Sequence, residues 1–211
     1  SVNSSSDSDQ SNNTLSSSIT SLEQFVSKVP LYERFTSNTC PPCASFNPGF
    51  QTLLDNNQVN SNSNKVNTIK YQVNFPGAGD ESYNNDVGAR VTHYGINGVP
   101  SPLIDGVDAS GNQQELDNAS ENPGLLSISG EFEVNGNEVN INVDVESFVD
   151  INAKLHIAVV EKEYQNMQGT NGEAEFYQVL RKLLPSSNGT PLSLSSGSTE
   201  SVGVSYNFNV G

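Results

Sequence analysis

Two cysteines separated by two prolines are the residues of this sequence best suited to chemistry. Cys40 and Cys43 enclose Pro41 and Pro42, and the 211 residues hold no other cysteine. A disulfide that closes so short a loop constrains the unfolded chain little. The spacing therefore favours reversible thiol–disulfide chemistry over a purely structural bond.

A helix predicted to begin within this motif explains how one of the thiols would be activated. One face of this helix carries the following residues: Cys43, Phe46, Phe50, Leu53 and Leu54. Prolines suit the first turn of a helix. Cys40 precedes that turn, where unpaired N–H groups and the helix dipole favour a thiolate. We therefore assign Cys40 as the nucleophile and Cys43, on the buried face, as the thiol that resolves the mixed disulfide.

The elements around the motif indicate an α/β domain over residues 19–122. Strands are expected at 30–35 and 69–75, a helix at 81–94, and a further strand before the turn at Asp105-Gly106. A short amphipathic helix is expected from Ile19 to Val26, with Ser21 and Gln24 as its capping box. Residues 1–18 are almost wholly polar and are expected to be disordered, either as a tether or as a frayed terminus.

The pattern changes to serial strands after about Pro123, which predicts a second, all-β domain over residues 123–211. Asn135-Gly136 is a hairpin signal between two alternating runs. The strands are expected within the following ranges: 126–134, 139–145, 155–159, 176–184 and 202–210. With no helix between them, these strands are predicted to pack as a β-sandwich.

A second motif, Gly98-Val99-Pro100, follows the second strand and helix, and with it the sequence resembles the thioredoxin superfamily. Pro48, eight residues after Cys40, matches the kinked helix of that family. The resemblance implies that Val99–Pro100 is a cis bond packed against the CxxC loop. It also implies that the Val99 backbone pairs with an extended protein substrate.

Two positions depart from the thioredoxin pattern. Thr39 stands where those proteins usually carry Trp, and Arg34 stands where they carry a buried acid. The neighbouring Glu33 has two interpretations. It either points inward and accepts a proton from Cys43, or it belongs to an exposed strand end beside Arg34.

A closer resemblance extends over nearly the whole chain after the polar lead. It is carried by the following segments: Phe35–Cys43, Phe75–Asp80, Tyr94–Gly106, Leu155–Lys162, Thr170–Glu173 and Leu183–Pro185. These are similar to the outer-membrane protein family of twenty-eight kilodaltons of certain Gram-negative bacteria. That resemblance implies a thioredoxin-like domain followed by an immunoglobulin-like one. It also implies a cell-envelope location, periplasmic, outer-membrane associated or extracellular, with lipid anchoring through a preceding segment as an option.

Composition excludes several other classes of function. A net charge of −15 argues against nucleic-acid binding. No apolar run reaches the roughly 18 residues of a membrane helix. Zinc would need four ligands, and only His93 and His156 could join the cysteines. The acidic stretch from Asp105 to Asp117 lacks EF-hand spacing and is expected to be solvated. No metal or cofactor is therefore expected.

Two hypotheses of function follow. The first is an extracytoplasmic thiol–disulfide oxidoreductase acting on protein substrates through Cys40 and Cys43. The second is a cell-envelope binding or adhesion module in which the thioredoxin fold is a scaffold and the disulfide stays closed. The polar stretch from Glu163 to Glu175 is expected to be an ordinary connection, with contact to a partner as the alternative.

Overall fold

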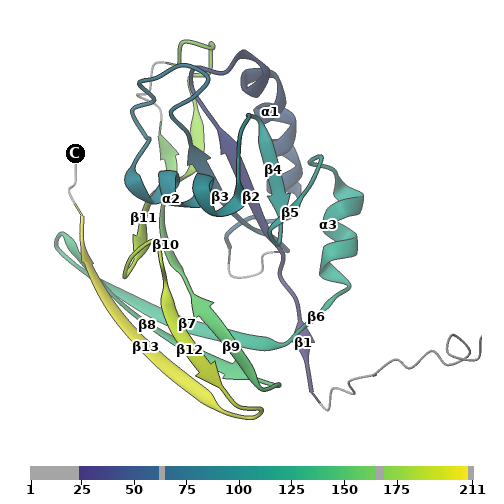
Figure 1. Cartoon of the computed structure of the whole chain (residues 1–211), viewed down its shortest axis with the longest axis vertical. Helices are drawn as coiled ribbons and strands as arrows, with labels where there is room; N and C mark the ends of the chain where they lie inside the picture. The colour runs from purple at the N-terminus through teal and green to yellow at the C-terminus, as the bar shows by residue number, and fades with distance from the viewer. Residues whose placement is uncertain (1–23, 62–64, 165–168, 209–211) are drawn as a thin grey trace, which may run out of the picture.

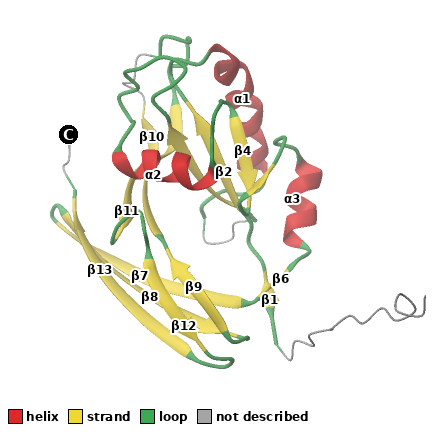
Figure 2. Ribbon diagram, viewed as in Figure 1, coloured by secondary structure: helices red, strands yellow, loops and turns green. Residues whose placement is uncertain are grey.

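A computed structural model describes residues 24–61, 65–164 and 169–208 of the chain. It contains one large mixed sheet with helices on both faces and, below it in Figure 1, a group of long curved strands. The helices all belong to the upper part, as Figure 2 shows by colour. The CPPC motif therefore lies in the α/β part of the chain.

The large sheet has six strands, and its central pair is parallel. In spatial order the strands are β10 (Ile157–Tyr164), β11 (Phe176–Leu184), β3 (Asn67–Gln72), β2 (Leu31–Thr36), β4 (Ser101–Ile104) and β5 (Val107–Asp108). β2 pairs in parallel with β3, and β3 in parallel with β11. β4 runs antiparallel to β2 and carries β5 at its other edge.

Three helices cover the two faces of this sheet. They are α1 (Pro41–Asn56), α2 (Asn85–Tyr94) and α3 (Gln113–Ser120). One buried cluster joins Phe50 and Leu54 of α1 to Tyr32 of β2 and Leu116 of α3. A second cluster joins α2 to the opposite face; its buried members are Phe35, Tyr71, Val73, Val87, Ile96, Leu103, Leu180 and Leu183. Neighbouring residues of β2 therefore point alternately toward α1 and toward α2.

The remaining strands form three small sheets. A three-stranded sheet has the order β13 (Thr199–Asn207), β8 (Glu138–Ser147) and β7 (Leu126–Asn135). The two-stranded sheets are β12 (Thr190–Leu194) with β9 (Ile151–Leu155), and β1 (Val26–Ser27) with β6 (Pro123–Gly124). Val143 and Val145 of β8 pack against Leu155, Leu192 and Leu194 of the β9–β12 pair. The lower part thus has a core of its own between two sheets.

The main correction to the sequence prediction concerns the strands at 155–159 and 176–184. The region from Leu155 to Tyr164 divides between the two parts, because Leu155 ends β9 whereas β10 begins at Ile157. β10 and β11 form a hairpin, and β11 pairs with β3 in the large sheet. Alternation of apolar residues reports which face is buried but not which sheet accepts the strand. The predicted boundary at residue 123 therefore does not separate the strands of the two parts.

Two smaller expectations also changed at the ends of the α/β part. The predicted helix from Ile19 to Val26 lies mostly outside the described residues, and Val26 itself belongs to strand β1. Helix α3 was not predicted. It begins with a capping box, in which the side chains of Asn112 and Glu115 each bind the other residue's backbone N–H.

Candidate functional site

The CPPC motif occupies the N-terminus of α1, as the sequence predicts. Cys40 is the N-cap residue, and Pro41 and Pro42 fill the first helical positions. Cys40 and Cys43 form a disulfide with their Cα atoms 5.3 Å apart. The Cys40 sulfur also accepts a hydrogen bond from the Cys43 backbone N–H at 3.2 Å. This N–H belongs to the first turn of the helix and also donates to the Cys40 carbonyl at 3.1 Å. A first-turn N–H thus points at the sulfur of the predicted nucleophile.

Val99 and Pro100, in the segment that leads into β4, lie next to this sulfur. The Val99–Pro100 bond is cis, as the resemblance to thioredoxins implies. The Val99 carbonyl oxygen lies 3.5 Å from the Cys40 sulfur. In the disulfide this is a contact without a proton, whereas a reduced Cys40 thiol could donate a hydrogen bond to that oxygen. Two residues 59 positions apart in the sequence therefore meet at one reactive atom.

Thr39, in the place of the usual Trp, ties the motif to the loop that follows β3. Its Oγ1 donates to the Gly77 carbonyl at 3.0 Å and accepts from the Gly77 N–H at 3.1 Å. A Cβ atom at Gly77 would lie 3.0 Å from the Thr39 Cβ, so glycine permits this approach. One position earlier, the Asn38 N–H donates to buried Asp80 at 2.9 Å. Burial raises the pKa of the Asp80 carboxyl group.

Residues 169–175, which we call the clasp segment, bind the other side of the motif. The Asn171 backbone N–H donates to the Asn38 carbonyl at 3.0 Å. The Asn171 side-chain amide donates to the carbonyls of Ser37 and Cys40 at 3.1 and 3.0 Å. The Asn171 carboxamide also contacts Glu173 through both its nitrogen and its oxygen. The predicted ordinary connection is therefore part of the surroundings of the disulfide.

Both thiol positions are closely covered in this arrangement. Cys40 is 1% exposed and Cys43 is 0% exposed, whereas Pro41 and Pro42 between them are exposed. The sequence predicts a buried Cys43 but does not predict that Cys40 is shielded as well. An incoming sulfur atom needs direct access to the sulfur that it attacks, so Cys40 must become more exposed before it can exchange.

Glu33 does not serve Cys43, which corrects both interpretations of this residue. Its side chain is 1% exposed and accepts hydrogen bonds from Tyr71, Arg90 and Tyr94, on the α2 face of the sheet. Arg90 completes an ion pair with it at 3.1 Å. Since α1 and Cys43 cover the opposite face, Glu33 is neither the proton acceptor of Cys43 nor part of an exposed strand end.

Arg34 points the other way, beneath α1, and meets a second buried cation. Arg34 and Lys70 are paired residues of β2 and β3 and are 1% and 2% exposed. Burial lowers the pKa of Arg34 to about 10. Burial and the neighbouring Arg34 charge lower the pKa of Lys70 well below its usual value. The negative charge of Glu173 partly offsets both pKa shifts, and its carboxylate accepts hydrogen bonds from Asn47 and Asn171.

Sequence reasoning missed Asn171 as a neighbour of the motif, and it missed Lys70 and Glu173 as neighbours of Arg34 and Asn47. From the sequence, the Thr170–Glu173 segment is part of a resemblance and of a predicted ordinary connection, and nothing in its composition indicates that it binds residues 37–40. Among the contacts of the described residues, none joins His93 or His156 to a cysteine. His93 is exposed at the end of α2 and packs edge-on against Tyr94. His156 lies between β9 and β10, and burial lowers its pKa.

Two further findings concern metals and membranes. Within residues 24–61, 65–164 and 169–208, no group of three His, Cys, Asp or Glu side chains is placed to hold a metal ion. In the acidic stretch, Asp105 instead pairs with Lys28, and Glu115 caps α3. Over the same described ranges, no helix has the length and apolar character needed to cross a membrane.

The order of elements and the site together define a thioredoxin-like scaffold with a disulfide-bonded CxxC pair. No family model and no curated protein matches the sequence. Among solved structures, the chain is similar to HBP35 of Porphyromonas gingivalis, with a TM-score of 0.69 and 12% identity over 86% of this chain. The match spans 64% of the HBP35 chain.

A structural-genomics protein of Agrobacterium tumefaciens is also similar. It has a TM-score of 0.55 and 17% identity, over 83% of this chain and 77% of that one. At such identities the likeness to either structure shows the fold alone.

Proposed function

We propose that this protein is a thiol–disulfide oxidoreductase that acts on protein substrates through Cys40 and Cys43. The observation that carries the proposal is the position of the Cys40 sulfur. It caps α1, accepts the Cys43 N–H, and lies 3.5 Å from the Val99 carbonyl. N–H groups at a helix N-terminus stabilise a thiolate, which is the attacking species in exchange.

The exchange balances as two successive displacements at sulfur. In the reduced protein, the Cys40 thiolate attacks one sulfur of a substrate disulfide and releases the other as a thiolate. The Cys43 thiolate then attacks the Cys40 sulfur, which releases the second substrate thiolate and forms the Cys40–Cys43 bond. The substrate gains two electrons and the protein loses two. The disulfide of this structure is the product of that direction and the reactant of the reverse one.

Val99 is proposed to orient the substrate during these steps. Its carbonyl oxygen borders the Cys40 sulfur, and Val99 itself is half-buried in the segment that enters β4. A strand-like substrate that paired with this backbone would bring its own sulfur into line with Cys40.

The test is turnover of insulin disulfides by the reduced protein in the presence of a small-molecule thiol reductant. We expect turnover by the native chain and none by Cys40→Ser. Cys43→Ser should trap a mixed disulfide, which mass spectrometry would detect. Equal, background rates for the native chain and Cys40→Ser would reject the catalytic role, provided that both are shown to be folded by circular dichroism.

A binding module is the second candidate, and two observations favour it. Cys40 is only 1% exposed, as a permanently closed disulfide would be. In addition, β7 exposes Ile128, Phe132 and Val134, at 61%, 73% and 52%. Exposed apolar groups on one strand are typical of a surface that another molecule covers. Phe132→Ser should then abolish partner binding while leaving the state of the cysteines unchanged.

We also propose that the protein acts in the cell envelope. The resemblance to the outer-membrane protein family supports this location, because that family is exported and often lipid-anchored. Fractionation of the producing cells, with detergent release of the membrane-bound part, tests the proposal. Recovery of the full chain in the cytoplasmic fraction alone would contradict it.

A further inference from the structure

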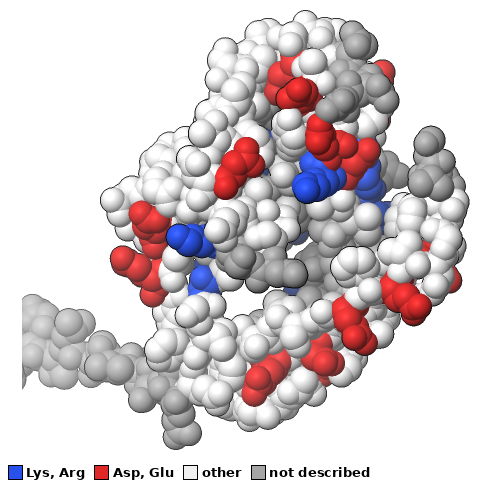
Figure 3. All heavy atoms as spheres, turned by 180° about the vertical axis from the view of Figure 1, so that it is seen from behind, with Lys and Arg blue, Asp and Glu red and all other residues white. Residues whose placement is uncertain are grey.

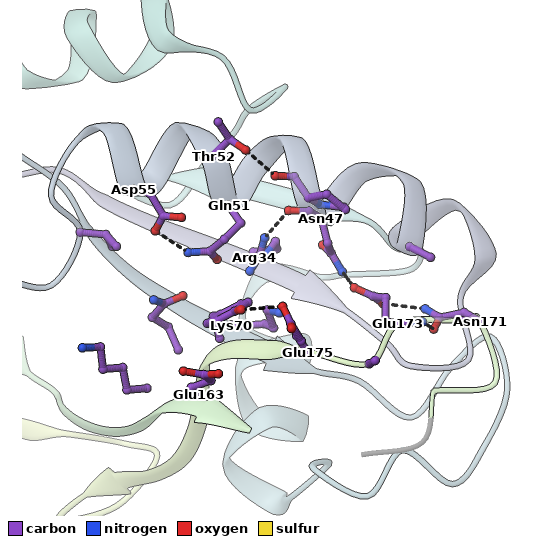
Figure 4. Close-up of a pocket in the computed structure, with 18 of the residues that line it drawn as sticks. Arg34, Asn47, Gln51, Thr52, Asp55, Lys70, Glu163, Asn171, Glu173 and Glu175 are labelled. Carbon is purple, nitrogen blue, oxygen red and sulfur yellow. Dashed lines mark hydrogen bonds between the residues drawn. The ribbon is translucent and has the colours of Figure 1, made fainter. Parts of the chain in front are cut away.

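A polar pocket lies between α1 and the β10–β11 hairpin, apart from the exposed prolines of the CPPC motif. Its volume is about 890 Å³, within the range of about 300–1,000 Å³ that small-molecule sites occupy. Figure 4 shows Asn47, Gln51 and Asp55 entering it from the helix, with Arg34 and Lys70 below them. Glu163, Glu173 and Glu175 border it on the hairpin side.

Two cations form the floor of this pocket, and they lack sufficient counter-charge. Arg34 and Lys70 are neighbours across β2 and β3, and both are at least 98% buried. Among the described residues, no carboxylate lies within 4.0 Å of either cation; the ion pairs found involve other residues. Arg34 donates only a long bond of 3.4 Å to the Asn47 carbonyl, and its Nε has no partner there. Buried like charges without an anion are costly, so the floor is suited to binding one.

The walls of the pocket carry hydrogen-bond acceptors that lack donors. Three buried amide oxygens have no donor in the part of the chain that the structure describes: Asn47 Oδ1, Gln51 Oε1 and Gln178 Oε1. The amide nitrogens of Asn47 and Gln51 already donate to Glu173 and Asp55, which fixes the free atoms as oxygens. Gln178 holds this place with a left-handed backbone, at φ 51°, inside β11. A ligand that pairs these oxygens must carry hydrogen-bond donors, either N–H or O–H groups.

The rim favours a positive group on the same ligand. Asp55, Glu163 and Glu175 also line the pocket, together with Lys162. On the face seen in Figure 3, basic side chains gather near the middle of the molecule with acidic ones beside them. Such a rim would repel a phosphate with its multiple charges but would attract an ammonium group.

From these features we infer that the pocket binds a free amino acid or short peptide, with its carboxylate on Arg34 and Lys70 and its N–H groups toward Asn47, Gln51 and Gln178. The terminal ammonium group faces the acidic rim. The inference is independent of the redox proposal, because none of these groups belongs to the exchange steps at Cys40 and Cys43. It assigns a small-molecule site to a face of the protein for which the redox proposal has no use.

Calorimetric titration of the oxidised full chain with the dipeptide Ala-Ala tests this site. We expect saturable binding by Ala-Ala, no measurable binding by its C-terminal amide, and weaker binding by its N-acetyl form. Arg34→Met and Lys70→Met should each weaken Ala-Ala binding about tenfold or more, since each removes a charged hydrogen-bond donor. Lys28→Met, which removes a cation paired with Asp105 outside this pocket, should bind as the native chain does.

Several results would overturn the assignment. They are no saturable binding of Ala-Ala to the native chain, equal binding of the amide, or inorganic phosphate binding as tightly as Ala-Ala. Unchanged binding by the floor variants would overturn it equally. If a floor variant does not fold, Gln51→Leu and Asp55→Asn on the α1 side replace it. Gln51→Leu should weaken the binding of both Ala-Ala and its N-acetyl form, whereas Asp55→Asn should weaken only the binding of Ala-Ala. Unchanged binding in both variants would refute the site.

Discussion

Replacing Asn171 by alanine should both destabilise the protein and expose its disulfide. The carboxamide nitrogen has two hydrogens, which it shares among the Ser37 carbonyl, the Cys40 carbonyl and Glu173. Its oxygen accepts one more bond, from the Glu173 N–H. The substitution therefore removes about three hydrogen bonds, two donated by the nitrogen and one accepted by the oxygen. At about 1 kcal/mol each, with some discount for partial exposure, the variant should lose about 2–3 kcal/mol.

Urea unfolding of the oxidised protein measures this loss. With a denaturant slope of about 2–3 kcal/mol/M, the midpoint of Asn171→Ala should fall by about 1 M. The matched control is Asn118→Ala on the exposed face of α3, where the carboxamide oxygen accepts a hydrogen bond from Gln114. That control should stay within about 0.5 kcal/mol of the native chain.

The same variant should also react faster with dithiothreitol, because the clasp segment would no longer be fixed on the backbone around Cys40. Reduction can be followed by thiol labelling at a urea concentration where all variants remain folded. An unchanged midpoint together with an unchanged reduction rate would refute the idea that the clasp segment controls the motif.

Three further predictions concern residues around the sheet. Glu33→Gln should cost about 3 kcal/mol in denaturant unfolding, because Arg90 loses its buried carboxylate, while the reduction potential of the cysteines stays as it was. Desolvation of Glu115 is outweighed by hydrogen bonds from Ser110, which lower its pKa to about 2. The pKa of Glu115 in the folded protein lies below its unfolded value of 4.5. The carboxylate therefore contributes fully to stability above pH 4.5, and this contribution is lost as the pH falls toward 2. The stability difference between the native chain and Glu115→Gln, measured by thermal melts, should shrink across that window. Thr39→Val should lower stability by about 1–3 kcal/mol, since the Gly77 N–H and carbonyl both lose their partner.

The part of the fold that is local in sequence could be predicted. The CPPC helix, strand β3 and the hairpin at Asn135-Gly136 follow from spacing, proline position and turn chemistry, and all are present. The cis bond before Pro100 came from the resemblance to thioredoxins. Each of these signals lies within a few residues of the feature that it predicts.

The part that depends on long-range pairing could not be predicted. The sequence predicts β11 as a strand of the sandwich, yet it joins β3, a strand more than 100 residues earlier, through one parallel pairing at Val179 and Lys70. The contacts of Asn171 with residues 37–40 follow from that pairing, because the β10–β11 hairpin carries the clasp segment to the motif. The periodicity of apolar residues does not predict which edge strand of a sheet a hairpin will pair with.

Glu33 and Arg34 illustrate a further limit of sequence reading. Two adjacent charged residues in a strand read most simply as an exposed end, because charged residues are rarely fully buried. Here both residues are buried, on opposite faces of the large sheet. Glu33 pairs with Arg90 on the α2 face, and Arg34 lies beneath α1. The ion-pair partner of Glu33 comes from α2, and the hydrogen-bond partner of Arg34 is the Asn47 carbonyl of α1, so only the tertiary structure identifies them.

The reduction potential of the Cys40–Cys43 pair, measured by equilibration with glutathione buffers and thiol labelling, tests the central claim most directly. A sulfur atom that caps α1 and accepts a helix N–H should give an exchangeable pair, with a potential between about −120 and −270 mV, the range of known exchange proteins. A potential below about −300 mV would identify a structural disulfide and contradict the oxidoreductase proposal.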